Sequence, residues 1–171
     1  MTVEIRALER SDDRQEFSCG DEALDLYFHR YAGQNQFRHH LGVTYVAVDA
    51  ERVLGFVTVS PGSLDADDLA SGQKTPPYPV PILRIARLAI DTSATGRGCG
   101  KALLRFAIEL AEKMMEELGC VGLVVDSKPE ATTFYERYGF ESLEALEGNL
   151  LERPAPIPMF LSIGSTAKKR R

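Results

Sequence analysis

The chain has 171 residues, enough for one domain with a buried core. Its formal net charge of −5 argues against a uniformly basic nucleic-acid-binding surface, although a local basic patch stays compatible with it. No run approaches the roughly 18 apolar residues of a membrane-spanning helix, and the three widely separated cysteines match neither a zinc site nor a disulfide framework. We therefore expect a cytoplasmic protein with no membrane partner and no metal.

The N-terminal half shows strand and helix patterns in turn. Apolar and charged residues alternate over 3–8, which predicts a strand. Residues 21–36 carry apolar side chains at helical spacing, which predicts a helix with one buried stripe. Residues 42–48 and 53–60 are predicted to form the two strands of a hairpin, and Pro61 is expected to end the second. The stripe of the helix consists of Leu24, Tyr27, Phe28 and Tyr31.

The C-terminal half continues this alternation. Residues 61–80 are rich in proline and aspartate and are expected to form a loop beside the functional site. A strand is predicted over 81–90 and an amphipathic helix over 99–118, followed by a strand over 121–125 whose continuous apolar run indicates burial on both faces. The apolar face of the helix consists of Leu103, Ala107, Leu110, Met114 and Leu118. The remaining predicted elements are a helix at 130–138 and strands at 140–146 and 157–163.

The segment that joins the strand 81–90 to the helix at 99 is the most informative. It carries Gly96, Gly98 and Gly100, and we call residues 95–101 the glycine turn. The first N–H groups of a helix have no partner within it, and the helix dipole adds partial positive charge at that end. Because glycines lack a Cβ, a bulky anion can approach this backbone. The turn therefore predicts a binding site for a phosphate or pyrophosphate.

Two common phosphate loops fit this segment poorly. In a P-loop, Lys101 would be followed by serine or threonine, but Ala102 stands there, and Thr95 occupies the position of the first glycine. A dinucleotide fingerprint requires Gly-x-Gly-x-x-Gly after the first strand, whereas this chain has Gly-x-Gly-x-Gly in mid-chain. A strand-to-helix turn that binds no ligand remains an alternative at this point.

The turn resembles the Gln/Arg-x-x-Gly-x-Gly/Ala loop that binds the coenzyme A pyrophosphate in GNAT-type N-acetyltransferases. Gly98 and Gly100 match its second half, Arg97 adds a cation, and Thr95 departs from the usual Gln or Arg. A second segment, over 129–140, resembles the Phe-Tyr-x-x-x-Gly-Phe signature of the same family. Its matching residues are Phe134, Tyr135, Gly139 and Phe140.

This resemblance covers nearly the whole chain and implies an α/β fold of the GNAT acyl-CoA N-acyltransferase type. In that fold, helices flank a mixed central sheet, and two splayed central strands, here 83–90 and 121–125, hold acetyl-CoA. It implies a single GNAT domain over 1–163, and we expect the basic tail 164–171 to be disordered. The implied acetyl-CoA-binding residues are Leu88, Ala89, Ile90, Thr95, Gly96, Arg97, Gly98, Cys99, Gly100 and Lys101.

The resemblance also assigns catalytic roles. A backbone N–H among residues 88–90 would polarise the thioester carbonyl, a contact that can contribute about 3 kcal/mol to a transition state. Tyr135 matches the family's catalytic tyrosine, which protonates the departing thiolate. Tyr138 is the alternative acid, and a purely structural Tyr135 remains open. Phe134 and Phe140 are expected in the core.

Other reactive side chains are given smaller roles. No general base declares itself, because His29, His39 and His40 are expected to be surface or packing residues. Cys99 is expected to point into the core rather than to act as a nucleophile. Arg87 and Arg38 are candidate residues for binding the acceptor substrate, the amine that receives the acetyl group. Arg87 lies on a predicted central strand, where we expect its charge to be buried.

The N-terminal half narrows the resemblance. Residues 17–27, with Phe17, Cys19 and Gly20 ahead of Leu24 and Asp25, look like the opening of GNAT toxins from bacterial type II toxin–antitoxin modules. That subfamily implies acetylation of the α-amino group of aminoacyl-tRNA, which blocks translation, a ribbon-helix-helix antitoxin and a homodimer. The alternative is a housekeeping GNAT enzyme that acetylates a small-molecule amine or a protein amino group, and a non-catalytic acyl-CoA-binding module ranks behind it. The cations available for tRNA are Arg30, Arg38, His39, His40, Arg52, Arg84, Arg97, Lys101, Arg105 and the basic tail.

Overall fold

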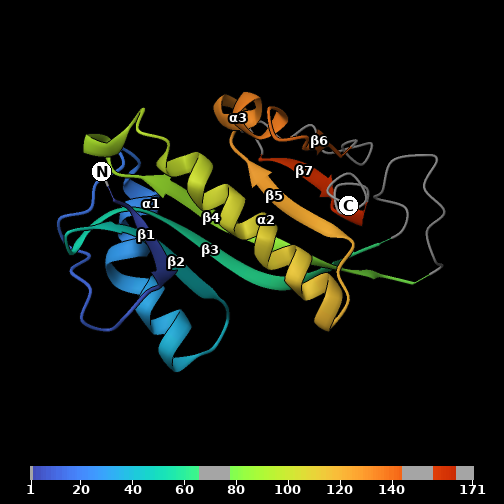
Figure 1. Ribbon diagram of the computed structural model, residues 1–171, viewed down its shortest axis with the longest axis horizontal. Helices are drawn as coiled ribbons and strands as arrows, with labels where there is room; N and C mark the ends of the chain where they lie inside the picture. The colour runs from blue at the N-terminus through green and yellow to red at the C-terminus, as the bar shows by residue number, and fades with distance from the viewer. Residues whose placement is uncertain (1, 66–77, 144–155, 165–171) are drawn as a thin grey trace. The chain divides into compact units, whose positions relative to one another are not determined.

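A computed structural model describes residues 2–65, 78–143 and 156–164 of the chain (Figure 1). Seven strands form a mixed sheet in the order β1-β2-β3-β4-β5-β7-β6. The chain divides into two compact units: a first unit of residues 1–60 and 85–109, and a second unit of residues 61–84 and 110–171. Within the described ranges no helix is long and apolar enough to cross a membrane. All but the first residue of the predicted basic tail lies outside those ranges.

The strands of the first unit begin with an antiparallel ladder. β1 (Glu4–Ala7) pairs with β2 (Val43–Asp49), which pairs in turn with β3 (Arg52–Leu64), so the predicted hairpin is confirmed. Its two turn residues, Ala50 and Glu51, have φ of 46° and 69°, as a type I′ turn requires.

The prediction that Pro61 ends the second strand of the hairpin is wrong, because β3 continues to Leu64. The register explains the difference. β2 reaches only to Val43, opposite Val59, so it forms no ladder with β3 at Pro61, and a residue without an N–H is tolerated beside such an edge.

The helix predicted over 21–36 is present, with an altered geometry. α1 (Glu22–Leu26) starts at Asp21, whose carboxylate accepts hydrogen bonds from two N–H groups of the first turn. The helix then continues through the π-helical segments η1 (Tyr27–Tyr31) and η2 (Gln34–Arg38). A π-helical turn contains more residues than an α-helical one, so side chains three apart, such as Phe28 and Tyr31, no longer share a face. Tyr31 is therefore 46% exposed, and its predicted place in the buried stripe is wrong.

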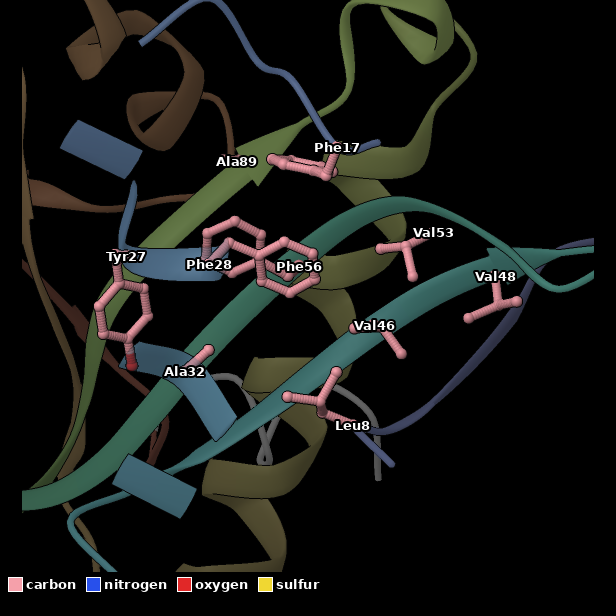
Figure 2. Packing of buried hydrophobic residues seen from close by; sticks show 10 residues of the cluster. All are labelled: Leu8, Phe17, Tyr27, Phe28, Ala32, Val46, Val48, Val53, Phe56 and Ala89. Carbon is pink, nitrogen blue, oxygen red and sulfur yellow. The ribbon is translucent and has the colours of Figure 1, made fainter. Parts of the chain in front are cut away.

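An aromatic cluster forms the core of the first unit (Figure 2). The rings of Phe28 and Phe56 stack with centroids 4.5 Å apart and planes inclined by 5°. Phe17 meets Phe28 edge-on, at a centroid distance of 4.9 Å. These contacts join the helix, β3 and the segment before the helix. Phe17, at the start of the segment 17–27, and Phe28, just beyond its end, are therefore part of the packed core.

β4 (Val80–Ile90) and α2 (Cys99–Glu117) confirm the predicted strand and helix on either side of the glycine turn. The buried face of α2 consists of Leu103, Leu104, Ala107, Ile108 and Ala111. Leu118, predicted on this face, is 84% exposed, because the helix ends at Glu117 and Gly119 then turns the chain with φ of 107°.

The second unit contains the C-terminal strands and a short helix. β5 (Gly122–Ser127) pairs antiparallel with β7 (Ile157–Ser162), and β7 also pairs with β6 (Glu141–Ser142). Four consecutive residues at the start of β5 are buried, as its apolar run predicts. A 3-10 turn, η5 (Pro129–Ala131), leads into α3 (Thr132–Glu136). The strand predicted over 140–146 is observed as β6, and its residues from 144 on lie outside the described ranges.

Candidate functional site

The first four residues of the glycine turn are exposed, and its last three, Cys99 to Lys101, are the first residues of α2. A 3-10 turn, η4 (Thr92–Ala94), leads into it, and Thr95 to Gly98 are all exposed. Gly96 and Gly98 have φ of 82° and 81°, and a Cβ at either would meet no atom within 4 Å. Gly100 lies inside the first turn of α2. The open space beside the backbone means that a ligand can reach the N–H groups at the start of α2.

Cations lie next to this end of α2. Gly98, Lys101 and Arg105 line a shallow hollow of about 460 Å³ within the first unit. Its other lining residues are Ile5, Ala102, Phe106 and Glu109. Arg97 is exposed in the turn itself. The helix dipole and these side chains make the surroundings of the glycine turn electropositive, and anion binding there stays a prediction.

Cys99 packs into the core, as expected. It is 3% exposed and lies in a cluster with Leu54 and Ala94. Burial raises the pKa of its thiol, and the nearby charge of Arg97 opposes that shift. A buried, protonated thiol is a poor nucleophile, so Cys99 serves to anchor the start of α2.

Asp91, at the end of β4, is a buried carboxylate that the sequence reasoning missed. It is 3% exposed and accepts hydrogen bonds from the N–H of Ser18 at 3.0 Å and from the N–H and Oγ of Ser93 at 3.0 and 2.7 Å. Burial alone would raise the pKa of Asp91, but these hydrogen bonds and the charge of Arg52 hold it below its ordinary value. The available signal was an aspartate followed by Thr-Ser after an apolar strand, which is typical of a turn capped by its own side chain.

Arg87, on β4, is exposed, so the expectation that its charge is buried is wrong. Its guanidinium lies over the ring of Tyr27, 3.7 Å from the centroid, in a cation–π contact. Ala86 is exposed as well, so this part of β4 presents two consecutive side chains to solvent. Beyond it, Ala89 is buried, and Leu88 and Ile90 are half-buried.

The remaining site candidates of the N-terminal half are Arg38 and the three histidines. Arg38 is exposed at the end of η2. His39 and His40 are exposed, and His29 packs with its Nε2 2.7 Å from the carbonyl oxygen of Phe17. The three histidines are thus surface or packing residues, as expected.

Tyr135 belongs to the second unit, on α3. It is 6% exposed, and burial raises the pKa of its phenol to about 12. Its ring packs edge-on against Phe134 and Phe140, with centroids 5.1 and 5.5 Å away. Phe140 is buried as expected, whereas Phe134 is only half-buried. Such a phenol stays protonated at neutral pH and is available as an acid.

Tyr138, the alternative acid, is half-buried and contacts Phe134 at a centroid distance of 5.4 Å. Gly139 has φ of 95°, so the glycine of the second signature ends this segment in a conformation that disfavours other residues. A glycine-rich turn with an accessible backbone at a helix start and a helix carrying a buried, neutral tyrosine are features expected of an acyl-CoA N-acyltransferase.

Comparison with known proteins agrees with this class. The acetyltransferase (GNAT) domain matches residues 40–142. A tRNA-acetylating toxin of Mycobacterium tuberculosis is 34% identical over 140 residues, 80% of this chain and 82% of that protein. AtaT complexed with acetyl-methionyl-tRNAfMet superposes with a TM-score of 0.85 at 27% identity, over 99% of this chain and 100% of that one. A Tyr→Phe variant of AtaT, bound to the C-terminus of the antitoxin AtaR and acetyl-CoA, superposes with a TM-score of 0.78 at 26% identity, over 99% and 98%.

This chain belongs to the GNAT acetyltransferase family. The predicted fold class, an α/β GNAT domain with a mixed sheet, is confirmed.

Proposed function

We propose that this protein is the toxin of a type II toxin–antitoxin module and transfers the acetyl group of acetyl-CoA to the α-amino group of aminoacyl-tRNA. The observation that carries the proposal is the 34% identity to a tRNA-acetylating toxin over 80% of the chain. Its likeness to AtaT over 99% of the chain, in a complex with an acetylated aminoacyl-tRNA, supports the same substrate class. Translation stops because an acetylated α-amino group can no longer form a peptide bond.

Acetyl-CoA is proposed to bind with its pyrophosphate on the glycine turn. The N–H groups at the start of α2, Arg97 and Lys101 would hold the two phosphates. The backbone of residues 88–90 would hold the pantetheine arm, and one of its N–H groups would polarise the thioester carbonyl. In this assignment residues Thr95 to Lys101 bind the cofactor through their backbone N–H groups and through the charged side chains among them. No metal takes part.

Tyr135 is proposed as the general acid. The neutral amine attacks the carbonyl carbon of the thioester, the carbon–sulfur bond breaks, and the phenol gives its proton to the departing thiolate. The proton that the amine loses passes to water, from which Tyr135 is reprotonated. The match of Tyr135 to the second signature supports this role, and burial, which raises its pKa to about 12, keeps the phenol protonated at neutral pH.

Arg87 and Arg38 are proposed to contact the acceptor tRNA. Arg87 supports this role best, because its guanidinium is exposed and yet held in place on the ring of Tyr27. A ribbon-helix-helix antitoxin, a homodimeric assembly and a cytoplasmic location complete the proposal. The complex of the AtaT variant with the C-terminus of AtaR supports the antitoxin partner.

Incubation with labelled acetyl-CoA and a charged tRNA pool tests the proposal. We expect label on the α-amino group of the tRNA-bound amino acid, and none with deacylated tRNA or with tRNA whose α-amino group is already blocked. The formal net charge of −5 favours the second candidate, a GNAT enzyme for a small amine or a protein amino group. Label that avoids charged tRNA and appears on added polyamines or on lysate proteins would establish that candidate instead.

A further inference from the structure

One buried carboxylate joins two segments that are far apart in the chain. Asp91 accepts hydrogen bonds from Ser18 and from Ser93, and the carbonyl oxygen of Ser18 accepts one from the N–H of Thr92 at 2.9 Å. Arg52 lies 3.7 Å from the same carboxylate and donates to the hydroxyl of Ser93 at 3.1 Å. Both carboxylate oxygens are therefore used, so the charge is neutralised within the fold.

Backbone hydrogen bonds between Asp91 and Ala102 hold the segment that includes the glycine turn. The N–H of Ala94 donates to the carbonyl oxygen of Asp91 at 2.9 Å, and the N–H of Arg97 donates to that of Ala94 at 3.3 Å. The N–H of Ala102 donates to the carbonyl oxygen of Gly98 at 3.0 Å, which closes the first turn of α2. Asp91 and the segment 92–94 that it contacts thus lie directly before the turn and are hydrogen-bonded to it.

The segment held by Asp91 is itself fixed on its other side. The N–H of Cys19 and the hydroxyl of Ser18 donate to Asp25, at 2.9 and 3.4 Å, and Phe17 is 2% exposed in the aromatic core. Asp91 is consequently attached to a rigid part of the first unit. Without such an attachment the two left-handed glycines would leave the turn free to adopt many conformations.

We infer that Asp91 is a positioning residue for the pyrophosphate of acetyl-CoA: it holds the glycine turn, through Ser93 and the segment 17–19, in the conformation that binds the anion. Asp91 is 3% exposed, so its role would be to position the turn rather than to contact the ligand. Its negative charge is stabilised by the Ser18 and Ser93 donors and partly offset by the positive charge of Arg52. This inference rests on the proposed cofactor site and adds the residue that shapes it.

The test measures the Kd of coenzyme A and steady-state kinetics for Asp91→Asn and Ser93→Ala. In Asp91→Asn, an amide NH₂ replaces one acceptor oxygen and faces an N–H donor. We expect Kd and the KM for acetyl-CoA to rise about tenfold, because charged acceptors contribute most to such bonds, while kcat at saturating cofactor stays within about twofold. Ser93→Ala removes only the exposed hydroxyl, is expected to fold, and should raise Kd about threefold to fivefold.

Asp12→Asn is the matched control. Asp12 is also a shielded carboxylate of the first unit, bonded to Arg6 at 2.7 Å and to the N–H of Glu9 at 2.8 Å, and none of its contacts involves residues 91–101. It should lower the melting temperature and leave Kd unchanged. Wild-type affinity for coenzyme A in both Asp91→Asn and Ser93→Ala would overturn the inference, since Asp91 would then serve only the fold. A wild-type protein that fails to bind coenzyme A would instead overturn the proposed function, and the inference with it.

Discussion

Replacing Gly98 with alanine separates backbone strain from ligand binding. Gly98 has φ of 81°, and a Cβ there would meet no protein atom within 4 Å, so the substitution causes no clash. The cost to the free protein is the left-handed conformation, about 1–2 kcal/mol for a residue with a Cβ. For a chain of this size, that lowers the melting temperature by about 2–8 °C.

The consequence for the ligand is larger. The added methyl group lies in the open space through which we propose that the pyrophosphate approaches the backbone of the glycine turn. Acetyl-CoA at about 100 times its Kd stabilises the wild-type protein by about 2.7 kcal/mol, or about 5–11 °C. If Gly98→Ala weakens binding a hundredfold, the same concentration contributes only about 0.4 kcal/mol. The ligand-induced shift then falls to about 1–2 °C.

Gly119→Ala is the control in a thermal-shift assay with and without acetyl-CoA. Gly119 also has a positive φ, 107°, with open space around its missing Cβ, and it ends α2 far along the chain from the glycine turn. It should lose as much intrinsic stability as Gly98→Ala and keep the full ligand-induced shift. A Gly98→Ala protein that retains the full shift would refute the assignment of the pyrophosphate to this turn.

Three further substitutions test other parts of the account. Gly122→Ala should cost about 3 kcal/mol in urea denaturation, because its Cβ would overlap the backbone carbonyl oxygen of Leu161, which cannot move aside; an unchanged urea midpoint would contradict the packing of β5 on β7. The hydrogen bond from Arg6 lowers the pKa of Asp12, so stability that is present above about pH 4 should be lost as the pH falls through the folded-state pKa. Asp12→Asn should flatten this part of the pH profile, and a profile as steep as that of the wild-type protein would be the wrong result. Arg87→Ala should raise the KM for aminoacyl-tRNA about tenfold, leave the KM for acetyl-CoA unchanged and reduce the salt slope of tRNA binding by about one, whereas an unaltered slope would exclude a phosphate contact.

Local patterns predicted those features that depend on neighbours along the chain. The apolar run of β5, the strand-turn-helix around the glycine turn and the burial of Cys99 all follow from short-range periodicity and turn chemistry. The two signatures, around Gly98 and Tyr135, were recognisable because each is a compact segment with glycines at required positions.

Features that depend on distant partners could not be predicted in this way. Asp91 owes its burial and its lowered pKa partly to Ser18, 73 residues earlier in the chain. Arg87 is exposed although it lies on β4, because the burial of a strand residue depends on neighbouring elements that the sequence of the strand does not encode. Tyr31 lies outside the buried stripe because π-helical bonding changes the angle between successive side chains. The spacing of apolar residues in the sequence does not distinguish a π-helix from an α-helix.

Single-turnover acetyl transfer by Tyr135→Phe tests the central claim most directly. With acetyl-CoA and aminoacyl-tRNA both saturating, the variant lacks only the proposed acidic hydroxyl, and the rate should fall about 10²–10⁴-fold while the affinity for acetyl-CoA and the melting temperature stay close to those of the wild-type protein. Tyr138→Phe, from the same segment, should react at nearly the wild-type rate. A Tyr135→Phe protein that transfers acetyl groups as fast as the wild-type protein would contradict the account.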